Sequence, residues 1–318
     1  MKLLETALQS RGSSRVTRIF HGPGDAPMGN ELTRVAIDRF EDHYWVHYWA
    51  DAKDQTPSEE VLEKLKTFLS QHKAKSAVLS LRPLGESPQV PTLLLGDEMP
   101  EPFTVNENGV LIEIRFKEMR HPGLFLDHAP LRAWLKKSMK GAEVLNTFAY
   151  TGSLSMAAAV GRASQVTTVD LSATTLEWAK RNAEINKVSA TCNEWFAEDF
   201  FEFAKRSAKK ARIWDCVILD PPSFSRSKSG TFSTQKDLKK LHVAALELVG
   251  REGYLVTSIN SEKISREYFW KEIDKAVEVV GARIEIVSKI ELPPQTFPTP
   301  ARRPEKNYLK GWILRRIR

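Results

Sequence analysis

The spacing of apolar residues predicts different architectures in the two parts of the chain. Residues 34–49 hold two short runs rich in β-branched and aromatic side chains around the polar positions 41–43, which indicates a β-hairpin. Ser58 then precedes a segment of helical periodicity and is its expected N-cap. The apolar stripe of that helix consists of Val61, Leu62, Leu65 and Leu69.

A strand at 77–81, a loop rich in proline and glycine and a second pair of strands in 103–116 follow. Asn106–Gly109 is the expected turn of that pair, since Asn and Gly adopt the backbone conformations that tight turns need. These elements predict a small α+β domain of order β-β-α-β-β over residues 1–120.

From about residue 141 strands and helices alternate strictly. The expected strands are 144–148, 165–170, 192–196, 214–220, 254–259, 283–290 and 308–315, and the expected helices are 154–160, 174–186, 200–207, 236–249 and 266–280. Such alternation predicts an α/β domain over residues 121–318, with a doubly wound, mostly parallel, seven-stranded sheet between two layers of helices. Ligands of such sheets bind at the carboxyl ends of the strands.

Composition and charge narrow the possible functions. The 318 residues are 42% hydrophobic and 27% charged, as in soluble globular proteins, and Lys plus Arg exceed Asp plus Glu by seven. The isoelectric point of about 9.3 favours a polyanionic partner. The two cysteines lie in no CxxC pattern and the histidines show no ligand spacing, so we expect neither a disulfide framework nor a metal site. No run is apolar enough for a signal peptide or a membrane span, which favours a cytoplasmic location.

A nucleotide-type site is indicated where the first two strands of the second domain end. The first strand is followed by a turn with the single glycine Gly152, and the second ends at Asp170, eighteen positions later. A glycine there allows close approach of the backbone, and the acid accepts hydrogen bonds from a ribose. The GxGxxG pattern that binds a pyrophosphate is absent, which favours a ligand without phosphate, such as S-adenosylmethionine. Alternatively, Gly152 only forms a tight turn and Asp170 only caps the next helix.

Two further acids follow later strands. Asp199 comes after the third strand, where its carboxylate can accept the amino group of an adenine or cap the next helix. Asp220 begins the run DPPSFSRSK at the end of the fourth strand. Pro221 and Pro222 lack N–H groups and force the chain out of the sheet on a fixed path. This path predicts that Asp220 and Phe224 lie over the strand ends, where an acceptor and a ring suit a planar base.

These motifs together resemble the bacterial 23S ribosomal RNA methyltransferases, a class I S-adenosylmethionine-dependent family. The runs GLFLDH at 123–128, NTFAYTGS at 146–153 and DPPSFSRSK at 220–228 carry the resemblance, which extends over most of the chain. It is closest to the half of the bifunctional large-subunit enzyme that forms 7-methylguanine. The resemblance implies S-adenosylmethionine as cofactor, RNA as partner, and an N-terminal domain that contacts the substrate.

The resemblance also implies roles for individual residues. The expected cofactor-binding residues are Phe125, Asp127, Asn146, Phe148, Tyr150, Thr151, Gly152, Asp170, Leu171, Asp199, Phe200 and Asp220. Among them Phe125 and Asp127 would close over the cofactor, although Asp127 is equally suited to cap the helix that follows. The expected residues around the target base are Asp220, Pro221, Pro222, Phe224 and Asn260.

The positions of the cysteines distinguish between two target bases. Relatives that methylate cytosine at carbon five need a thiol that attacks the ring. Asn260 and Ser223 stand where such a thiol would be, and Cys216 lies inside a strand as an expected core residue. A guanine ring nitrogen has its own lone pair and needs only alignment with the methyl group, so N7 of guanine is the expected target.

Basic residues near the predicted pocket and at the C-terminus favour contacts with phosphates. They are Arg226, Lys228, Lys236, Lys239, Lys240 and the seven Lys or Arg residues of 301–318. A solvated edge strand is the alternative explanation for the C-terminal group. A methyltransferase acting on another RNA, a protein or a small molecule, and an RNA-binding protein without activity, also remain open.

Overall fold

The computed structural model describes residues 1–11, 14–51, 55–86, 89–96, 101–117, 120–227, 230–299 and 307–317. The chain forms two compact units. The N-terminal unit consists of residues 1–128 together with 293–304, and the second unit consists of residues 129–292 together with 305–318. The sequence-based boundary at 120/121 therefore lies eight residues earlier than the division in the structure, and the return of 293–304 to the first unit has no counterpart in it.

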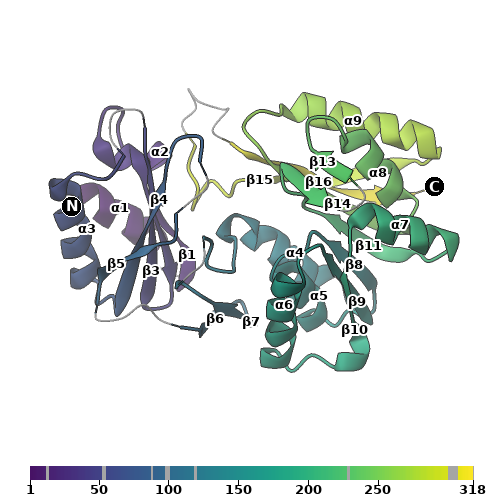
Figure 1. Cartoon of the computed structure of the whole chain (residues 1–318), viewed down its shortest axis with the longest axis horizontal. Helices are drawn as coiled ribbons and strands as arrows, with labels where there is room; N and C mark the ends of the chain where they lie inside the picture. Colours follow the sequence, from purple (N-terminus) through teal and green to yellow (C-terminus); the bar gives the residue numbers. More distant parts are fainter. Residues whose placement is uncertain are drawn as a thin grey trace. The chain divides into compact units, whose positions relative to one another are not determined.

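The N-terminal unit contains a five-stranded sheet of order β1-β2-β3-β4-β5 (Figure 1). Helix α3 (Glu59–Gln71) connects the parallel pair β3 and β4, and the other neighbours are antiparallel. Ser58 caps α3 as predicted, because its hydroxyl accepts the N–H of Val61 at 3.3 Å. The strands are β1 (Val16–His21), β2 (Val35–Phe40), β3 (His43–Trp49), β4 (Ser76–Arg82) and β5 (Thr92–Leu95), and helices α1 (Lys2–Arg11) and α2 (Gly22–Asp25) flank β1.

This unit differs from the sequence-based prediction in two ways. Strands β6 (Phe103–Glu107) and β7 (Val110–Ile114) form a separate two-stranded sheet and do not complete the main one, which β5 closes. Their turn is the predicted one, with Asn108 and Gly109 at φ of 53° and 79° as a type I′ turn requires. Strand β1 was not predicted because it carries the buried charge of Arg18, which is satisfied by two hydrogen bonds to Asp38 of 2.6 and 2.9 Å.

The second unit contains a seven-stranded sheet of order β10-β9-β8-β11-β14-β16-β15 (Figure 1). Only β16 runs against its neighbours, so the predicted doubly wound, mostly parallel sheet is confirmed. The strand order reverses between the neighbouring strands β8 and β11. In such sheets ligands bind at the carboxyl ends of the strands on either side of this reversal. The strands are β8 (Glu143–Thr147), β9 (Gln165–Asp170), β10 (Asn193–Ala197), β11 (Trp214–Leu219), β14 (Val249–Asn260), β15 (Ile284–Glu291) and β16 (Leu309–Arg316).

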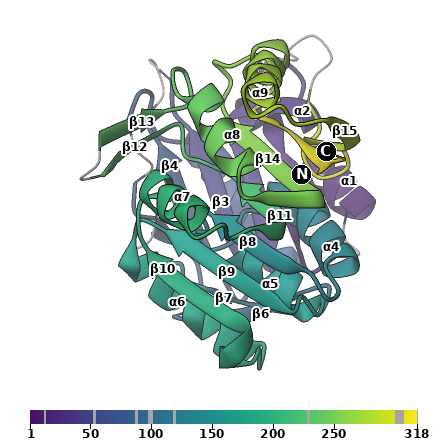
Figure 2. The ribbon, with the colours of Figure 1, turned by 90° about the vertical axis from the view of Figure 1, so that its right-hand side faces the viewer.

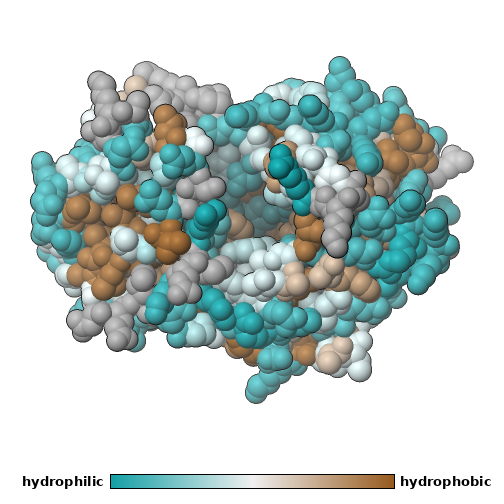
Figure 3. Space-filling view, in the orientation of Figure 1, coloured by the Kyte–Doolittle hydropathy of each residue, from teal (hydrophilic) through white to brown (hydrophobic). Residues whose placement is uncertain are grey.

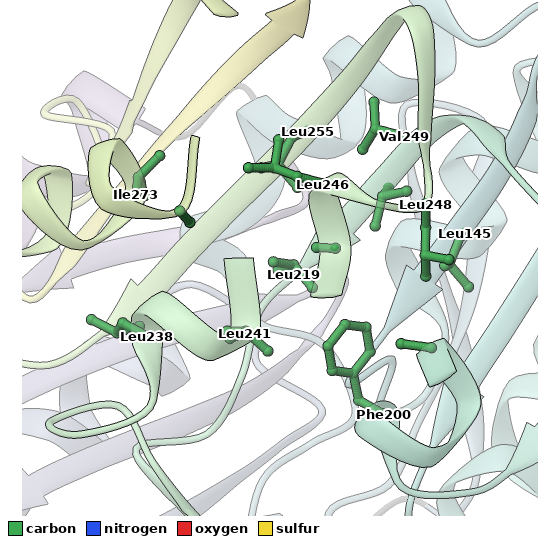
Figure 4. Close-up of a cluster of buried hydrophobic side chains, with 14 of the residues drawn as sticks. Leu145, Phe200, Leu219, Leu238, Leu241, Leu246, Leu248, Val249, Leu255 and Ile273 are labelled. Atoms are coloured by element: carbon green, nitrogen blue, oxygen red, sulfur yellow. The ribbon is translucent and has the colours of Figure 1, made fainter. Parts of the chain in front are cut away.

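Six helices cover the two faces of this sheet (Figures 1 and 2). Helices α4 (Ala129–Ser138), α5 (Ser153–Val160) and α6 (Ala173–Ile185) pack beside one another on one face. Helices α7 (Phe200–Lys209), α8 (Leu238–Leu246) and α9 (Arg266–Val280) do so on the other. Under the second group lies an apolar core, where side chains of α7, α8, α9, β11 and β14 point toward one another (Figure 4).

An additional hairpin, which the sequence did not predict, lies between β11 and α8. It consists of β12 (Phe224–Ser227) and β13 (Gly230–Ser233), which pair only with each other (Figure 2). Hydrophilic residues cover much of the face shown in Figure 3, with smaller hydrophobic groups between them. Within the described ranges, none of the helices has the length and apolar character needed to cross a membrane.

Candidate active site

The turn from β8 to α5 contains a cluster of unusual backbone conformations. Gly152 has φ of 74°, and a Cβ atom there would lie 2.8 Å from that of Ala179. Phe148 and Tyr150 also have positive φ, of 55° and 52°, which costs free energy in residues that carry a side chain. Such conformations persist where the surrounding structure enforces them, and they often occur at binding sites. The turn pattern indicated Gly152, whereas Phe148 and Tyr150 were expected at the site only from the family resemblance.

Asp170, at the end of β9, organises this turn through its carboxylate. Oδ2 accepts the N–H of Tyr150 at 2.8 Å, and Oδ1 accepts the N–H of Ser172 at 2.8 Å and the hydroxyl of Thr175 at 3.2 Å. Burial and the neighbouring carboxylate raise the pKa of Tyr150, which therefore stays protonated. Because a carboxylate offers about four acceptor directions, Asp170 can still accept a hydrogen bond from a ligand hydroxyl.

Asn146 lies below the turn and is buried. Its Nδ2 donates to Ser155 Oγ at 2.9 Å, and Ser155 Oγ in turn lies 2.8 Å from Thr168 Oγ1. The Oδ1 of Asn146 has no hydrogen-bond partner among the described residues. Thr151 is buried as well, and its carbonyl accepts the side chain of Asn182 at 2.9 Å. The expected methionine end of the site is thus lined by polar groups held in fixed positions.

The structure places Asp199 at the start of α7 as its N-cap. Its Oδ1 accepts the N–H groups of Phe201 and Glu202 at 2.9 and 3.4 Å, so the capping interpretation is correct, while Oδ2 has no donor among the described residues. Phe200 is buried in the core, with its ring centroid 5.5 Å from that of Phe148. Leu171, directly after Asp170, is 47% exposed.

The acid-proline turn after β11 meets the end of β14. Asp220 Oδ1 accepts the hydroxyl of the buried Ser258 at 2.7 Å, and Ser223 Oγ donates to the carbonyl of Asn260 at 3.3 Å. Pro221 is buried and Pro222 is exposed, so the first proline packs against the unit while the second faces solvent. The structure therefore places the acid-proline turn against the end of β14, and the contact of Asp220 and Asn260 with a target base stays a prediction.

Phe224 lies in the hairpin that the sequence did not predict, and its position over the strand ends stays a prediction. This residue does not lie in an irregular turn but begins β12, and its side chain is 53% exposed. The guanidinium of Arg226 lies over the ring, with 5.5 Å from Cζ to the centroid. The exposed ring is accessible for stacking by a planar group.

The thiols lie away from this turn. Cys216 is fully buried within β11, and burial raises the pKa of its thiol, so that it is not ionised near neutral pH. Cys192 lies in a short 3-10 helix directly before β10, the strand at one edge of the sheet. Among the described residues, neither cysteine is adjacent to Asp220 or Asn260 along the chain or in the strand register.

The basic residues of β16 serve the fold. This strand pairs on both sides, so it is not the solvated edge strand that the sequence allowed. Lys310 Nζ donates to the carbonyl of Ser261 at 2.7 Å. Arg315 pairs with Glu252 and Glu285 at 2.7 and 3.4 Å. The remaining tail residues Arg302, Arg303, Lys306 and Arg318, like Lys228 in the hairpin, lie outside the described residues.

Phe125 and Asp127 belong to the N-terminal unit. Phe125 is 40% exposed, and Asp127 is buried in a 3-10 helix directly before α4, where its Oδ1 lies 3.2 Å from His128 Nδ1. Their contact with a cofactor stays a prediction. No group of three or more potential metal-ligating side chains occurs in the part of the chain that the structure describes.

Comparison with known proteins identifies the chemistry of this site. A family model for S-adenosylmethionine-dependent methyltransferases matches residues 17–306. The chain belongs to this family. The methyltransferase therefore uses S-adenosylmethionine as its cofactor, and the donor set fits that ligand, with a carboxylate at the end of β9 for a ribose and no cluster of glycines for a phosphate.

Individual relatives agree with this assignment. The chain is 31% identical to YwbD of Bacillus subtilis, a candidate ribosomal RNA large subunit methyltransferase, over 94% of this chain and 74% of the relative. It is 32% identical to the ribosomal RNA large subunit methyltransferase K/L of Alteromonas mediterranea over 88% of this chain, but spans only 39% of that longer protein. The crystal structure of SMU.776, a candidate methyltransferase complexed with SAH, matches with a TM-score of 0.84 and 25% identity over 99% of this chain and 80% of that one.

Proposed function

We propose that this methyltransferase modifies 23S ribosomal RNA at N7 of a guanine. The names of the relatives support ribosomal RNA of the large subunit as the substrate class, without specifying the base. The basic character of the chain agrees with a polyanionic substrate. We also propose that the N-terminal unit contributes to RNA binding.

The choice of base rests on the composition of the acid-proline turn. Two hydrogen bonds join the turn to β14, one from Ser258 to Asp220 and one from Ser223 to Asn260, and none of these residues supplies a thiol. Methylation of cytosine at carbon five needs a covalent bond from such a thiol to the ring. Guanine N7 carries a lone pair and no proton. It can attack the methyl group directly, so that a new N–C bond forms as the S–C bond breaks, and no general base is required.

The residues around the turn supply binding and orientation for this step. When bound, S-adenosylmethionine supplies a methyl group on a positively charged sulfur. Phe224 stacks the flipped base, and Asp220 or Asn260 accepts or donates hydrogen bonds at its edge. The rigid path of Pro221 and Pro222 keeps these groups at a fixed distance from the cofactor turn. Their combined contacts must offset the few kcal/mol that unstacking the base from the RNA costs.

We assign the cofactor end of the site to residues of the β8, β9 and β10 ends. Asp170 accepts from the ribose, and the free Oδ2 of Asp199 accepts the adenine amino group, with Leu171 and Phe200 beside the ring. The methionine portion lies along Asn146, Phe148, Tyr150, Thr151 and Gly152. Phe125 and Asp127 are further candidates for contact with the cofactor.

The direct test is incubation of purified protein with unmodified 23S ribosomal RNA and cofactor labelled in the methyl group. Borohydride reduction followed by aniline cuts RNA at 7-methylguanine, and the expected result is cleavage at a labelled guanine. Phe224→Ala should reduce turnover on RNA strongly while SAH binding stays unchanged, since the ring contacts only the base. Label in cytosine, or activity that disappears in Cys216→Ser, would contradict the assignment to guanine N7.

A further inference from the structure

The β12–β13 hairpin has two chemically different faces. Residues opposite each other in an antiparallel pair point to the same face, and the face alternates along each strand. The register pairs Ser225 with Phe232 and Arg226 with Thr231. Phe232 is 5% exposed, whereas Arg226 and Thr231 are exposed. The hairpin is therefore an amphipathic ribbon with one buried and one solvent-facing side.

The buried side attaches the ribbon to the cofactor turn. The ring of Phe232 lies stacked on that of Phe148 with centroids 6.1 Å apart, and 6.0 Å from the ring of Phe201. The base of the ribbon is held as well, because Thr234 N–H donates to the carbonyl of Ser223 at 3.2 Å. These contacts fix the orientation of the outer side relative to the acid-proline turn.

The outer side has the composition of a nucleic-acid contact. Phe224 and Arg226 lie two residues apart on one strand, with the guanidinium over the ring, and Arg226 has no ion-pair partner among the described residues. An exposed arginine with a planar fork suits a phosphate, and a hydroxyl such as that of Thr231 can donate to the same group. Such side chains are found on surfaces that bind single-stranded RNA.

We infer that the outer side of the β12–β13 ribbon holds the RNA strand next to the target base. Arg226 binds the phosphate that flanks the target nucleotide, and Thr231 donates to the same phosphate from the neighbouring strand. This inference rests on the proposed function, because it takes RNA as the substrate. It adds a contact outside the pocket for the target base. Since Phe232 packs against Phe148 in the cofactor turn, RNA bound to the ribbon is held at a fixed position relative to the cofactor.

The test compares Arg226→Glu with Arg251→Glu, a matched reversal of charge. Arg251 is also exposed and without a described ion pair, but it lines a cavity of about 610 Å³ at the amino ends of the strands. Binding of unmodified 23S ribosomal RNA is measured by filter binding over a salt series, with SAH affinity measured by calorimetry. Arg226→Glu should weaken RNA binding by about three- to tenfold or more and make the log–log salt slope shallower by roughly 0.7. Arg226→Lys should retain most of the affinity, and SAH affinity should not change.

Each outcome bears on one of the two proposals. Equal effects of Arg226→Glu and Arg251→Glu, or no effect of either, would overturn the ribbon site. If Arg226→Glu binds RNA as tightly as wild type and methylates guanine normally, the ribbon site is overturned while the proposed function stands. If the wild-type protein binds RNA through Arg226 but methylates no guanine in it, the proposed function fails and the ribbon site stands.

Discussion

Replacement of Asp170 is expected to separate cofactor binding from the stability of the fold. Asp170→Ala removes the acceptor for a ribose hydroxyl together with those for Tyr150 N–H, Ser172 N–H and the Thr175 hydroxyl. A hydrogen bond to a charged group contributes about 1.5–3 kcal/mol, which corresponds to roughly ten- to a hundredfold in affinity. Three of about four acceptor directions are already used, so we expect the ribose to gain one strong hydrogen bond rather than two.

Calorimetry of SAH binding measures this effect, and a second variant controls for the turn. Thr175→Val removes only the 3.2 Å contact to Asp170 Oδ1 and leaves the carboxylate in place, so its SAH affinity should change by less than about threefold. Asp170→Asn keeps one carbonyl oxygen and should fall between Ala and wild type. Thermal unfolding verifies that each variant is folded. If Asp170→Ala is folded and binds SAH as tightly as wild type, Asp170 does not contact the cofactor.

Three further predictions concern the cofactor turn, a buried histidine and the base pocket. In Gly152→Ala, a residue with a side chain must adopt a positive φ, and its Cβ atom would lie 2.8 Å from that of Ala179. We expect the free energy of unfolding, measured by urea titration, to fall by about 1–3 kcal/mol. Burial lowers the pKa of His242 to about 4, so between pH 6.5 and 4 the imidazole binds a proton in the unfolded chain but not in the folded one. The free energy of unfolding therefore decreases as the pH is lowered through this range. His242→Gln should remove up to about 1.4 kcal/mol per pH unit of this slope, measured by urea unfolding at pH 7, 6 and 5. Ser258→Ala removes the 2.7 Å hydrogen bond to Asp220 Oδ1 and should reduce kcat at saturating RNA by about three- to tenfold with unchanged SAH affinity.

The elements that the sequence predicted are those in which apolar residues recur at a regular spacing, or in which a capping or turn residue marks an end of the element. The strands and helices after residue 141 alternate with clear apolar runs, and all of them occur in the structure. The cap at Ser58 and the turn at Asn106–Gly109 depend on side chains next to the backbone they stabilise. Such features need no knowledge of distant parts of the chain.

The features that the sequence missed depend on tertiary contacts. Strand β1 carries Arg18 at a buried position, and the partner Asp38, twenty residues away, stabilises the buried charge. The positive φ of Phe148 is enforced by the packing of the turn, because Phe normally avoids it. The β12–β13 hairpin follows a motif whose prolines indicated an irregular path, and its strands have only four residues each. Short strands of this kind give little periodicity to recognise.

Capping and ligand binding are not alternatives at the two acids that follow β9 and β10. Asp199 caps α7 with Oδ1 alone, and its Oδ2 has no donor among the described residues. Asp170 accepts three hydrogen bonds from the chain, and these fix its carboxylate in one orientation at the strand end. A carboxylate held by backbone N–H groups loses little conformational entropy when a ligand hydroxyl or amine arrives. In the proposed roles, the capping contacts prepare these acids for binding, and the informative quantity at each one is the number of hydrogen bonds that its carboxylate can still accept.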